Sequence, residues 1–243
     1  MNNVLVCPIA FNEHQKLKNA IERFLRTSFY GKVDYLVMDD GSTDGTTEMI
    51  RSFSDRGVKT LKHPQRRGVG AAIRSAIDYA RSQGYEIIVI MAGNDKDEPN
   101  EIGLLVDPIL NGQADFVQGS RYLKGRRTGG DMPFYRKIAT RMHPFLLSFF
   151  VRRRVTDSTN GFRAIRLSIL ADERINLNQD WLDAYELEPY LLFKCIQAGY
   201  RFVEAPVTKI YPSRQLGYTK MKPVTGWWSI LRPVIFLGLG LKQ

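Results

Sequence analysis

Short apolar runs alternate with stretches of helical spacing over the first half of this chain. The apolar runs have the length of buried strands and lie at residues 4–9, 35–38, 58–61 and 87–91. Between them, apolar residues recur at three- and four-residue intervals, which predicts helices at 12–25, 46–53 and 68–82. Strands that alternate with helices favour right-handed crossovers. The pattern therefore predicts an α/β fold, a Rossmann-like and mostly parallel sheet with helices on both faces.

The second half of the chain is less regular. A helix at 101–110, a strand at 116–119 and helices at 133–151 and 186–198 are expected. The segment 125–130 is rich in Gly, Arg and Thr, which favours a mobile loop over the crevice, and 156–163 reads as irregular. We expect one catalytic domain over 1–222 and an amphipathic or apolar tail over 223–243.

Composition narrows the class of partner. The 243 residues suit a single large domain, and a formal net charge of +10 favours anionic partners such as nucleotide diphosphates, lipid phosphates, an acidic membrane or nucleic acid. Cys7 and Cys195 have no metal-binding spacing and are expected to be buried thiols. No signal-peptide pattern precedes the first strand, so a cytoplasmic protein is expected, either free or bound peripherally to the cytosolic face of a membrane.

The stretch 39–46 carries the clearest candidate chemistry. Asp39 and Asp40 end an apolar run and lead into Gly41-Ser42-Thr43-Asp44, so a buried strand delivers carboxylates to a loop. One of the three residues after Gly41 is expected to cap the next helix, whose backbone N–H groups then face the same crevice. The same residues are also good turn formers, and the turn alone implies no ligand.

Seven short motifs, taken in order, resemble the inverting glycosyltransferases of family 2, most closely the branch that includes dolichyl-phosphate mannose synthase. They cover most of the chain up to about residue 222 and lie at 8–13, 39–44, 68–72, 119–121, 157–163, 199–207 and 214–220. The resemblance implies a GT-A fold, a nucleoside-diphosphate sugar donor linked to uridine or guanosine, and a divalent cation, Mg²⁺ or Mn²⁺.

The resemblance also implies roles for single residues. Near the base and ribose it places Pro8, Phe11, Glu13, Met38 and Asp40, and it adds Asn94 to the donor-binding group. A carboxylate accepts hydrogen bonds from a base or ribose, and an aromatic ring offers a stacking face. Toward the phosphates of the donor or the acceptor, it places Arg121, Arg214 and Lys220, which suit that role because guanidinium and ammonium groups bind phosphate oxygens.

The expected metal motif is altered in this chain. Family members carry Asp-any-Asp after the fourth strand, where this sequence reads Gly93-Asn94-Asp95. Asp95 and Asp97, with the diphosphate oxygens, are the expected ligands of Mg²⁺ or Mn²⁺. Two alternatives stay open, namely that cationic side chains such as Lys96 replace the metal, and that the segment is only a polar turn.

Two carboxylates are expected beside the acceptor. The resemblance places Asp157 there, and Glu188 is a second candidate for a base, although it is displaced by two residues from the usual glutamate. For a hydroxyl acceptor such a base is useful because it removes the proton, whereas a phosphate acceptor is already anionic and needs none. The apolar segment 145–151 before Arg152-Arg153-Arg154, together with Trp227-Trp228, favours a lipid-phosphate acceptor at a membrane surface. A buried helix pair or a homodimer contact is the alternative.

Two other functions compete with glycosyl transfer. A nucleotidylyltransferase is disfavoured because the first strand is followed by Ala10-Phe11-Asn12-Glu13 and not by a glycine-rich basic loop. A catalytically impaired adaptor that binds a sugar nucleotide or a membrane agrees with the missing carboxylate at Gly93. The motifs give no reason to expect nucleic acid as a partner. The three histidines have no ligand spacing and are expected to be solvent or packing residues.

Overall fold

The structure is a computed structural model, and it describes residues 3–29, 31–125, 128–130, 132, 134–211 and 225–242. Its first half confirms the predicted alternation of strands and helices. The strands are β1 (Val4–Ala10), β2 (Val33–Asp39), β3 (Val58–Lys62) and β4 (Ile87–Ala92). The helices between them are α1 (His14–Leu25), α2 (Thr46–Arg51) and α3 (Val69–Ser82). These four strands are parallel and lie in the order β3-β2-β1-β4.

Three more strands extend the sheet beyond β4. They are β5 (Phe116–Ser120), β7 (Arg163–Arg166) and β8 (Phe202–Pro206), and α4 (Ile102–Leu110) precedes β5. Strand β7 lies between β4 and β5 and is antiparallel to both, while β5 and β8 are parallel. The sheet is therefore mixed but mostly parallel. The apolar pattern did not predict β7, because it has only four residues and two of them are arginines.

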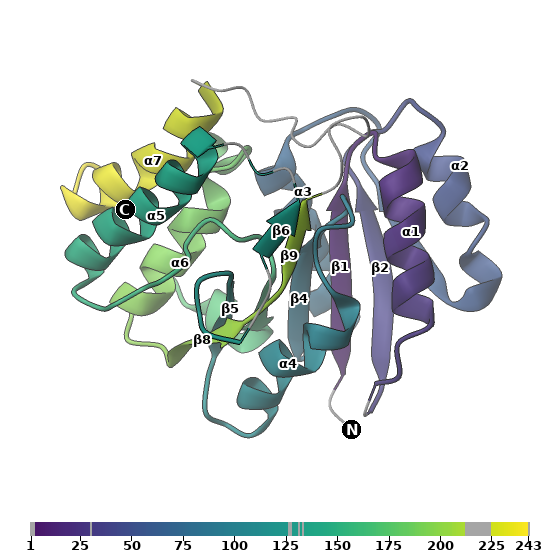
Figure 1. The fold of residues 1–243 in the computed structure, drawn as a ribbon, viewed down its shortest axis with the longest axis horizontal. Helices are drawn as coiled ribbons and strands as arrows, with labels where there is room; N and C mark the ends of the chain where they lie inside the picture. Colours follow the sequence, from purple (N-terminus) through teal and green to yellow (C-terminus); the bar gives the residue numbers. More distant parts are fainter. Residues whose placement is uncertain are drawn as a thin grey trace.

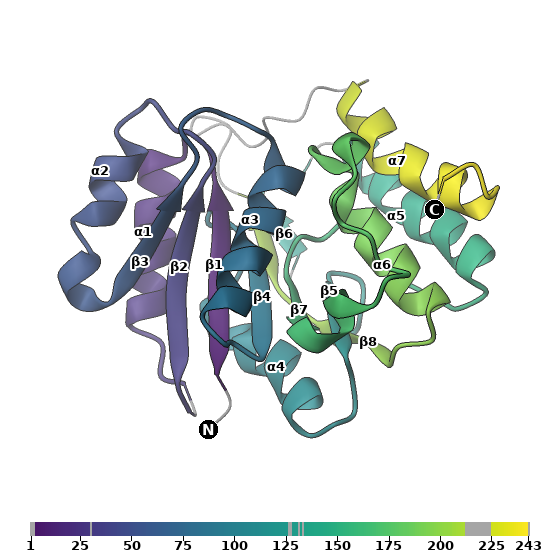
Figure 2. The same cartoon turned by 180° about the vertical axis from the view of Figure 1, so that it is seen from behind.

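Each face of the sheet is covered by its own group of helices. Alternate residues of β1 divide between the faces, so that Leu5 and Cys7 pack with α3 while Val4 and Val6 pack with α1 and α2. Helix α6 (Leu187–Gln197) lies on the α3 side, and α4 lies on the α1 side. Figures 1 and 2 show these two layers from opposite directions. This arrangement confirms the α/β fold predicted from the sequence.

A second layer of helices covers α6. It consists of α5 (Phe134–Val151) and α7 (Thr225–Gly238), which lie together at the side of the molecule away from β2 and β3 (Figure 1). Val234 and Leu237 of α7 are buried in the core on the α6 side, and Arg232 of α7 forms an ion pair with Glu186. Within the described ranges, no helix combines the length and the apolar character that a bilayer span needs. The segment 223–243 thus contributes to the core as far as the structure describes it.

A small two-stranded sheet lies next to the carboxyl ends of the main strands. It pairs β6 (Thr128–Gly130) with β9 (Lys209–Tyr211) in parallel. The sequence predicted a mobile loop at 125–130, but the last three of these residues form β6. Residues 126 and 127 lie outside the described part of the chain. Strand β9 is also tied to the loop after β4, because Asp97 and Lys209 form an isolated bridge.

Candidate active site

A cavity opens at the carboxyl ends of the parallel strands, where open α/β sheets bind their ligands. Its walls come from the ends of β1 and β4, the loops after β2 and β5, the start of α3 and the segments around α5, α6 and β9. Five basic and three acidic side chains line it, which favours an anionic ligand. The basic residues are Arg66, Lys96, Arg121, Arg136 and Lys209, and the acidic ones are Glu13, Asp40 and Glu188.

Asp40 is buried at the cavity wall and holds a neighbouring loop in place. Its carboxylate accepts hydrogen bonds from the backbone N–H groups of Arg67 at 2.8 Å and Gly68 at 2.9 Å, and His63 Nδ1 lies 2.8 Å from Asp40 Oδ1. Gly68 has a φ of +108°, and a Cβ there would lie 2.4 Å from the carbonyl oxygen of Asp183. Asp40 therefore fixes the approach of α3 to the cavity. His63, expected to be a solvent or packing residue, belongs to this scaffold.

The other residues of the 39–46 turn join the first two strand-to-helix loops. Asp39 accepts hydrogen bonds from Ser42 N and Thr47 Oγ1, and Ser42 Oγ accepts one from Asn12 N at 2.8 Å. Gly45 is the N-cap of α2 and gives no side-chain cap, but Asp44 Oδ1 accepts from Thr46 N at 3.1 Å. Of the three residues expected to cap this helix, Asp44 makes the bond.

Phe11 and Glu13 form the outer wall of the cavity. The guanidinium of Arg66 lies 4.4 Å from the centre of the Phe11 ring, which is a cation–π contact. Glu13 lines the cavity and pairs with Lys16 at 2.8 Å. An aromatic ring next to a cation and a carboxylate is a suitable wall for a nucleotide base and its ribose. Both residues were predicted for that role.

Two of the predicted donor residues do not line the cavity, and two predicted phosphate residues cannot be placed because they lie outside the described part of the chain. Pro8 is buried within β1, and Met38 is buried in the core on the α3 side. Neither side chain lines the cavity. Arg214 and Lys220 lie outside the described residues. Met38 is fully buried, so its side chain is not exposed for the predicted contact with the base edge.

The two carboxylates expected to hold a metal are engaged by basic side chains. Arg23 Nη1 lies 2.7 Å from Asp95 Oδ1, and the pKa of Asp95 is raised by burial, against the lowering effect of Arg23. One carboxylate oxygen of Asp97 accepts a hydrogen bond from Lys209 Nζ, and the other accepts one from Ala92 N at 3.0 Å. Neither side chain lines the cavity, and no cluster of three metal-ligating acidic, His or Cys side chains occurs in the described ranges. These contacts do not fit the expected Mg²⁺ or Mn²⁺ site.

The backbone after β4 also leaves no room for the missing carboxylate. A Cβ built on Gly93 would lie 2.9 Å from the carbonyl oxygen of Ile9 and 2.9 Å from Ala10 Cβ, closer than real Cβ contacts. Beside it, Asn94 faces the cavity, and its buried Oδ1 has no hydrogen-bond donor among the described residues. That oxygen is placed to accept a hydrogen bond from a ligand hydroxyl.

Lys96 stands on the cavity wall where the metal was expected. It is 5% exposed, and its ammonium lies 5.2 Å from the centre of the Tyr211 ring. Burial and the nearby charges of Lys209, Arg136 and Lys16 lower the pKa of Lys96 to about 7. Lys96 therefore loses its proton more readily than an exposed lysine does, and an anion bound beside it would favour the protonated form.

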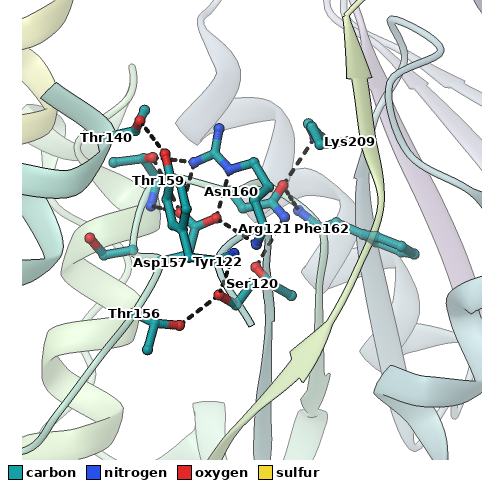
Figure 3. A network of polar contacts seen from close by, with 12 residues as sticks. Ser120, Arg121, Tyr122, Thr140, Thr156, Asp157, Thr159, Asn160, Phe162 and Lys209 are labelled. Atoms are coloured by element: carbon teal, nitrogen blue, oxygen red, sulfur yellow. Dashed lines mark hydrogen bonds and ion pairs between the residues drawn. The ribbon is translucent and has the colours of Figure 1, made fainter. Parts of the chain in front are cut away.

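Arg121 and Asp157 form a buried ion pair at the end of β5 (Figure 3). Arg121 Nε lies 2.6 Å from Asp157 Oδ2, and Nη2 lies 2.7 Å from Oδ1, so the pair is bidentate. The same guanidinium donates to Tyr211 Oη and Thr159 Oγ1. Burial alone would lower the pKa of Arg121, but the Asp157 carboxylate raises it above its ordinary value. Arg121 reaches the cavity, whereas Asp157 is fully buried beneath it.

Glu188 is the second candidate carboxylate, and it does face the cavity. It lies in the first turn of α6, and its Oε1 accepts from Arg163 Nη2 at 2.9 Å. Arg163 is buried and also donates to the carbonyl oxygens of Asn160 and Glu188. Both candidate bases are therefore paired with an arginine.

Sequence reasoning missed five residues of the basic and aromatic wall. Arg66 comes from the loop before α3, Arg136 from the first turns of α5 and Tyr185 from the segment before α6. Lys209 and Tyr211 come from β9. None of them lies in a motif quoted for the resemblance. The net charge of +10 was the only signal that further cations would gather at a site.

The sheet order, the antiparallel β7 and the cavity at the strand ends agree with a GT-A fold. Comparison with known proteins then identifies the family. The sequence model described as "Glycosyl transferase family 2" matches residues 6–173, and the chain belongs to that family. It is a glycosyltransferase that uses nucleotide-sugar donors, as the resemblance implied.

Two relatives lie at about 30% identity. The polyprenol monophosphomannose synthase of Mycolicibacterium smegmatis is 31% identical over 221 residues, covering 89% of this chain and 80% of that protein. The undecaprenyl-phosphate mannosyltransferase of Micrococcus luteus is 30% identical over 193 residues, covering 77% of this chain and 75% of that protein. Glucosyl-3-phosphoglycerate synthase from Mycobacterium tuberculosis, solved with Mn²⁺, uridine diphosphate and phosphoglyceric acid, matches with a TM-score of 0.68. At 18% identity over 100% of this chain and 80% of that one, the last match supports the fold.

Proposed function

We propose that this enzyme transfers a sugar, with inversion, from a nucleoside-diphosphate sugar to a polyprenyl phosphate at a membrane surface. The observation that carries the proposal is the position of α5. Its first turns supply Arg136 to the basic cavity, and its later turns carry a row of exposed apolar side chains. One helix therefore joins an anion-binding cavity to a surface suited to lipid.

The proposed step is a direct displacement. An oxygen of the acceptor phosphate attacks the anomeric carbon opposite the diphosphate, and a new carbon–oxygen bond forms. The bond from that carbon to the diphosphate oxygen breaks, and its electron pair leaves with the nucleoside diphosphate. No proton has to be removed from a phosphate acceptor. Catalysis then requires orientation of the two substrates and stabilisation of the leaving charge.

The pairing of the candidate bases supports an acceptor of this kind. Asp157 is fixed in its bidentate pair with Arg121, and Glu188 is held by Arg163. A carboxylate oxygen that already accepts from an arginine is less available to contact an acceptor hydroxyl. Asp157 and Glu188 are therefore better suited to hold neighbouring side chains of the cavity wall in place than to remove a proton from a hydroxyl. We assign Asp157 to positioning of Arg121, and Glu188 to contact with the transferred sugar.

The acceptor is expected to arrive from an anionic leaflet. Along α5, four apolar side chains share one face at helical spacing and are 45 to 77% exposed. Three exposed arginines, at 152–154, follow the helix. An apolar face next to cations is typical of peripheral attachment to the cytosolic side of a membrane. The four side chains are Ile138, Met142, Phe145 and Phe149, and we call them the α5 stripe.

The nucleotide is expected to lie against Phe11, Arg66 and Glu13, with Asn94 Oδ1 accepting from a hydroxyl and the basic wall facing the diphosphate. Mg²⁺ or Mn²⁺ bound by Asp95 and Asp97 is not part of the proposal, because both carboxylates are engaged by basic side chains. The relatives' names do not agree on the sugar, and the cavity contacts do not select uridine or guanosine.

The test is a transfer assay in which the protein is incubated with vesicles that contain undecaprenyl phosphate. Radiolabelled GDP-mannose, UDP-glucose and UDP-N-acetylglucosamine are supplied one at a time as donors. One donor is expected to label the lipid fraction, and the product is expected to have the anomeric configuration opposite to that of the donor. Arg136→Met is expected to reduce the rate about tenfold or more, because it removes a phosphate-facing cation. Arg81→Met, on the exposed end of α3, is the matched control. Equal labelling of undecaprenol, which lacks the phosphate, would contradict the proposal.

A further inference from the structure

The cavity wall after β4 carries a lysine, Lys96, where a GT-A site would carry a metal. We propose, on the basis of the function proposed above, that Lys96 binds the diphosphate of the donor in place of a divalent cation. The chain would then bind nucleoside diphosphates equally well with and without Mg²⁺ or Mn²⁺.

The carboxylates after β4 serve the fold. Arg23 of α1 bridges Asp95 and Glu98, with distances of 2.7 and 2.6 Å. This pairing ties the loop after β4 to α1. Asp97 is 2% exposed and bonds Lys209 of β9 and the backbone of Ala92, which ties the same loop to the small sheet. A cation that recruited both carboxylates would have to break contacts to two different elements.

The backbone at Gly93 is closely packed. The backbone of β1 passes so near that even a methyl group at this position would contact Ile9 O and Ala10 Cβ at 2.9 Å. The strands β1 and β4 are paired at this point, with Ile9 opposite Ala92. An aspartate in the first position of the motif would therefore push the two central strands apart. The packing of β1 against β4 therefore excludes a carboxylate side chain at position 93.

Lys96 itself lies where the altered motif meets the cavity. It lines the cavity together with Asn94 and Gly93, the residues that replace the first part of the metal motif. Its backbone is fixed, because Ile210 N donates to Lys96 O at 3.2 Å and its neighbour Asp97 bridges to Lys209. Arg121, Arg136 and Lys209 line the same cavity. A diphosphate there would meet several cations, of which Lys96 is the one delivered by the β4 turn.

The test is calorimetric titration of the wild-type chain with UDP and with GDP, in EDTA and then with Mn²⁺. For the diphosphate that binds, the affinity in EDTA is expected to lie within about twofold of that in Mn²⁺. Lys96→Met is expected to weaken diphosphate binding about tenfold or more, since a charge-assisted contact is lost. Lys96→Arg is expected to restore part of that loss, and binding of the corresponding nucleoside, uridine or guanosine, is expected to be unchanged.

The control is Lys18→Met, which removes the same charge from an exposed position on α1. Wild-type binding that vanishes in EDTA and returns with Mn²⁺ would overturn the role of Lys96 and leave the proposed function standing. Full diphosphate affinity in Lys96→Met would overturn it too, as would loss of nucleoside binding in that variant, which would give Lys96 a structural role. If neither diphosphate binds with or without Mn²⁺, the proposed function itself fails.

Discussion

Asp40 combines two tasks at the scale of a single residue. It lines the cavity, and it also satisfies two backbone N–H groups and faces His63. A buried carboxylate with three partners cannot be removed without leaving donors unsatisfied. The loop at 63–68 and the start of α3 therefore depend on the same side chain that lines the cavity.

The first residue-scale prediction is that Asp40→Ala lowers the free energy of unfolding by about 1–3 kcal/mol, because buried donors lose their acceptor. We also expect the variant to lose the thermal stabilisation that a nucleoside diphosphate gives the wild type. Urea unfolding and thermal shift measure the two effects. Asp55→Ala, an exposed position before β3, serves as the control. A diphosphate-induced shift of wild-type size in Asp40→Ala would refute the assignment.

At the scale of elements, α5 has two differently used faces. Thr140 and His143 face the protein, where Tyr122 Oη lies 2.5 Å from Thr140 Oγ1 and His143 Nδ1 lies 2.6 Å from Ser158 Oγ. The α5 stripe faces outward next to an apolar groove that includes Trp227, Trp228 and Leu231 of α7. Contiguous exposed apolar residues on a surface indicate a binding face.

The element-scale prediction concerns this face. Replacement of Phe145 and Phe149, 77% and 71% exposed, by serine is expected to abolish sedimentation with phosphatidylglycerol vesicles. The fold should remain intact, because both rings lie mostly outside the core. Ile210→Ser, at an apolar position on β9 that is 52% exposed, is the control and should leave sedimentation unchanged. If the double variant still binds vesicles but shifts from dimer to monomer, the stripe is a contact between two copies.

The sequence pattern predicted the elements of the first half well and those of the second half less well. Long apolar runs such as 4–9 and 87–91 are buried on both sides, so their composition alone indicates a strand. Strands β6, β7 and β9 have three or four residues each and depend on neighbours from distant parts of the chain. Local composition carries no signal for such pairing.

The cavity residues likewise divide into those that a local sequence pattern predicts and those that depend on distant parts of the chain. Phe11, Asp40 and Arg121 follow directly after predicted strands, and the carboxyl ends of strands in an α/β sheet meet at one edge. Lys209 and Arg136 reach that edge through the β9 pairing and the orientation of α5, which no local pattern encodes. The engagement of Asp95 by Arg23, 72 residues away, was equally invisible to sequence reasoning.

At the scale of the whole molecule, the outer helices are joined to the body by a buried histidine. His143 Nε2 lies 3.0 Å from the carbonyl oxygen of Ile230 in α7 and must donate to it, so Nδ1 is the acceptor for Ser158. Burial lowers the pKa of His143 below its ordinary value of 6.5, although the charge of Asp157 acts in the opposite direction. The folded protein therefore holds this histidine neutral.

The prediction at this scale is a loss of stability in mild acid. Below pH 6.5 the unfolded chain binds a proton at His143 that the folded protein does not, so the free energy of unfolding falls as the pH falls. The contribution of this one group is at most about 1.4 kcal/mol per pH unit. Melting temperatures between about pH 7.5 and 5.5 should fall less steeply in His143→Gln than in wild type. His14→Gln, at an exposed position, should keep the wild-type slope, and equal slopes in all three would exclude the effect.

The cavity is lined by two separate stretches of the chain, which the antiparallel strand β7 brings together. Its walls come from residues up to Lys96 and from residues from Arg121 onward, and β7 places the second stretch against β4 at the edge of the first. The later stretch supplies Arg121, Arg136 and Lys209 to the same cavity that Phe11 and Asp40 of the earlier stretch line. A fragment of the chain that ended before β5 would therefore lack three of the five basic side chains of the cavity.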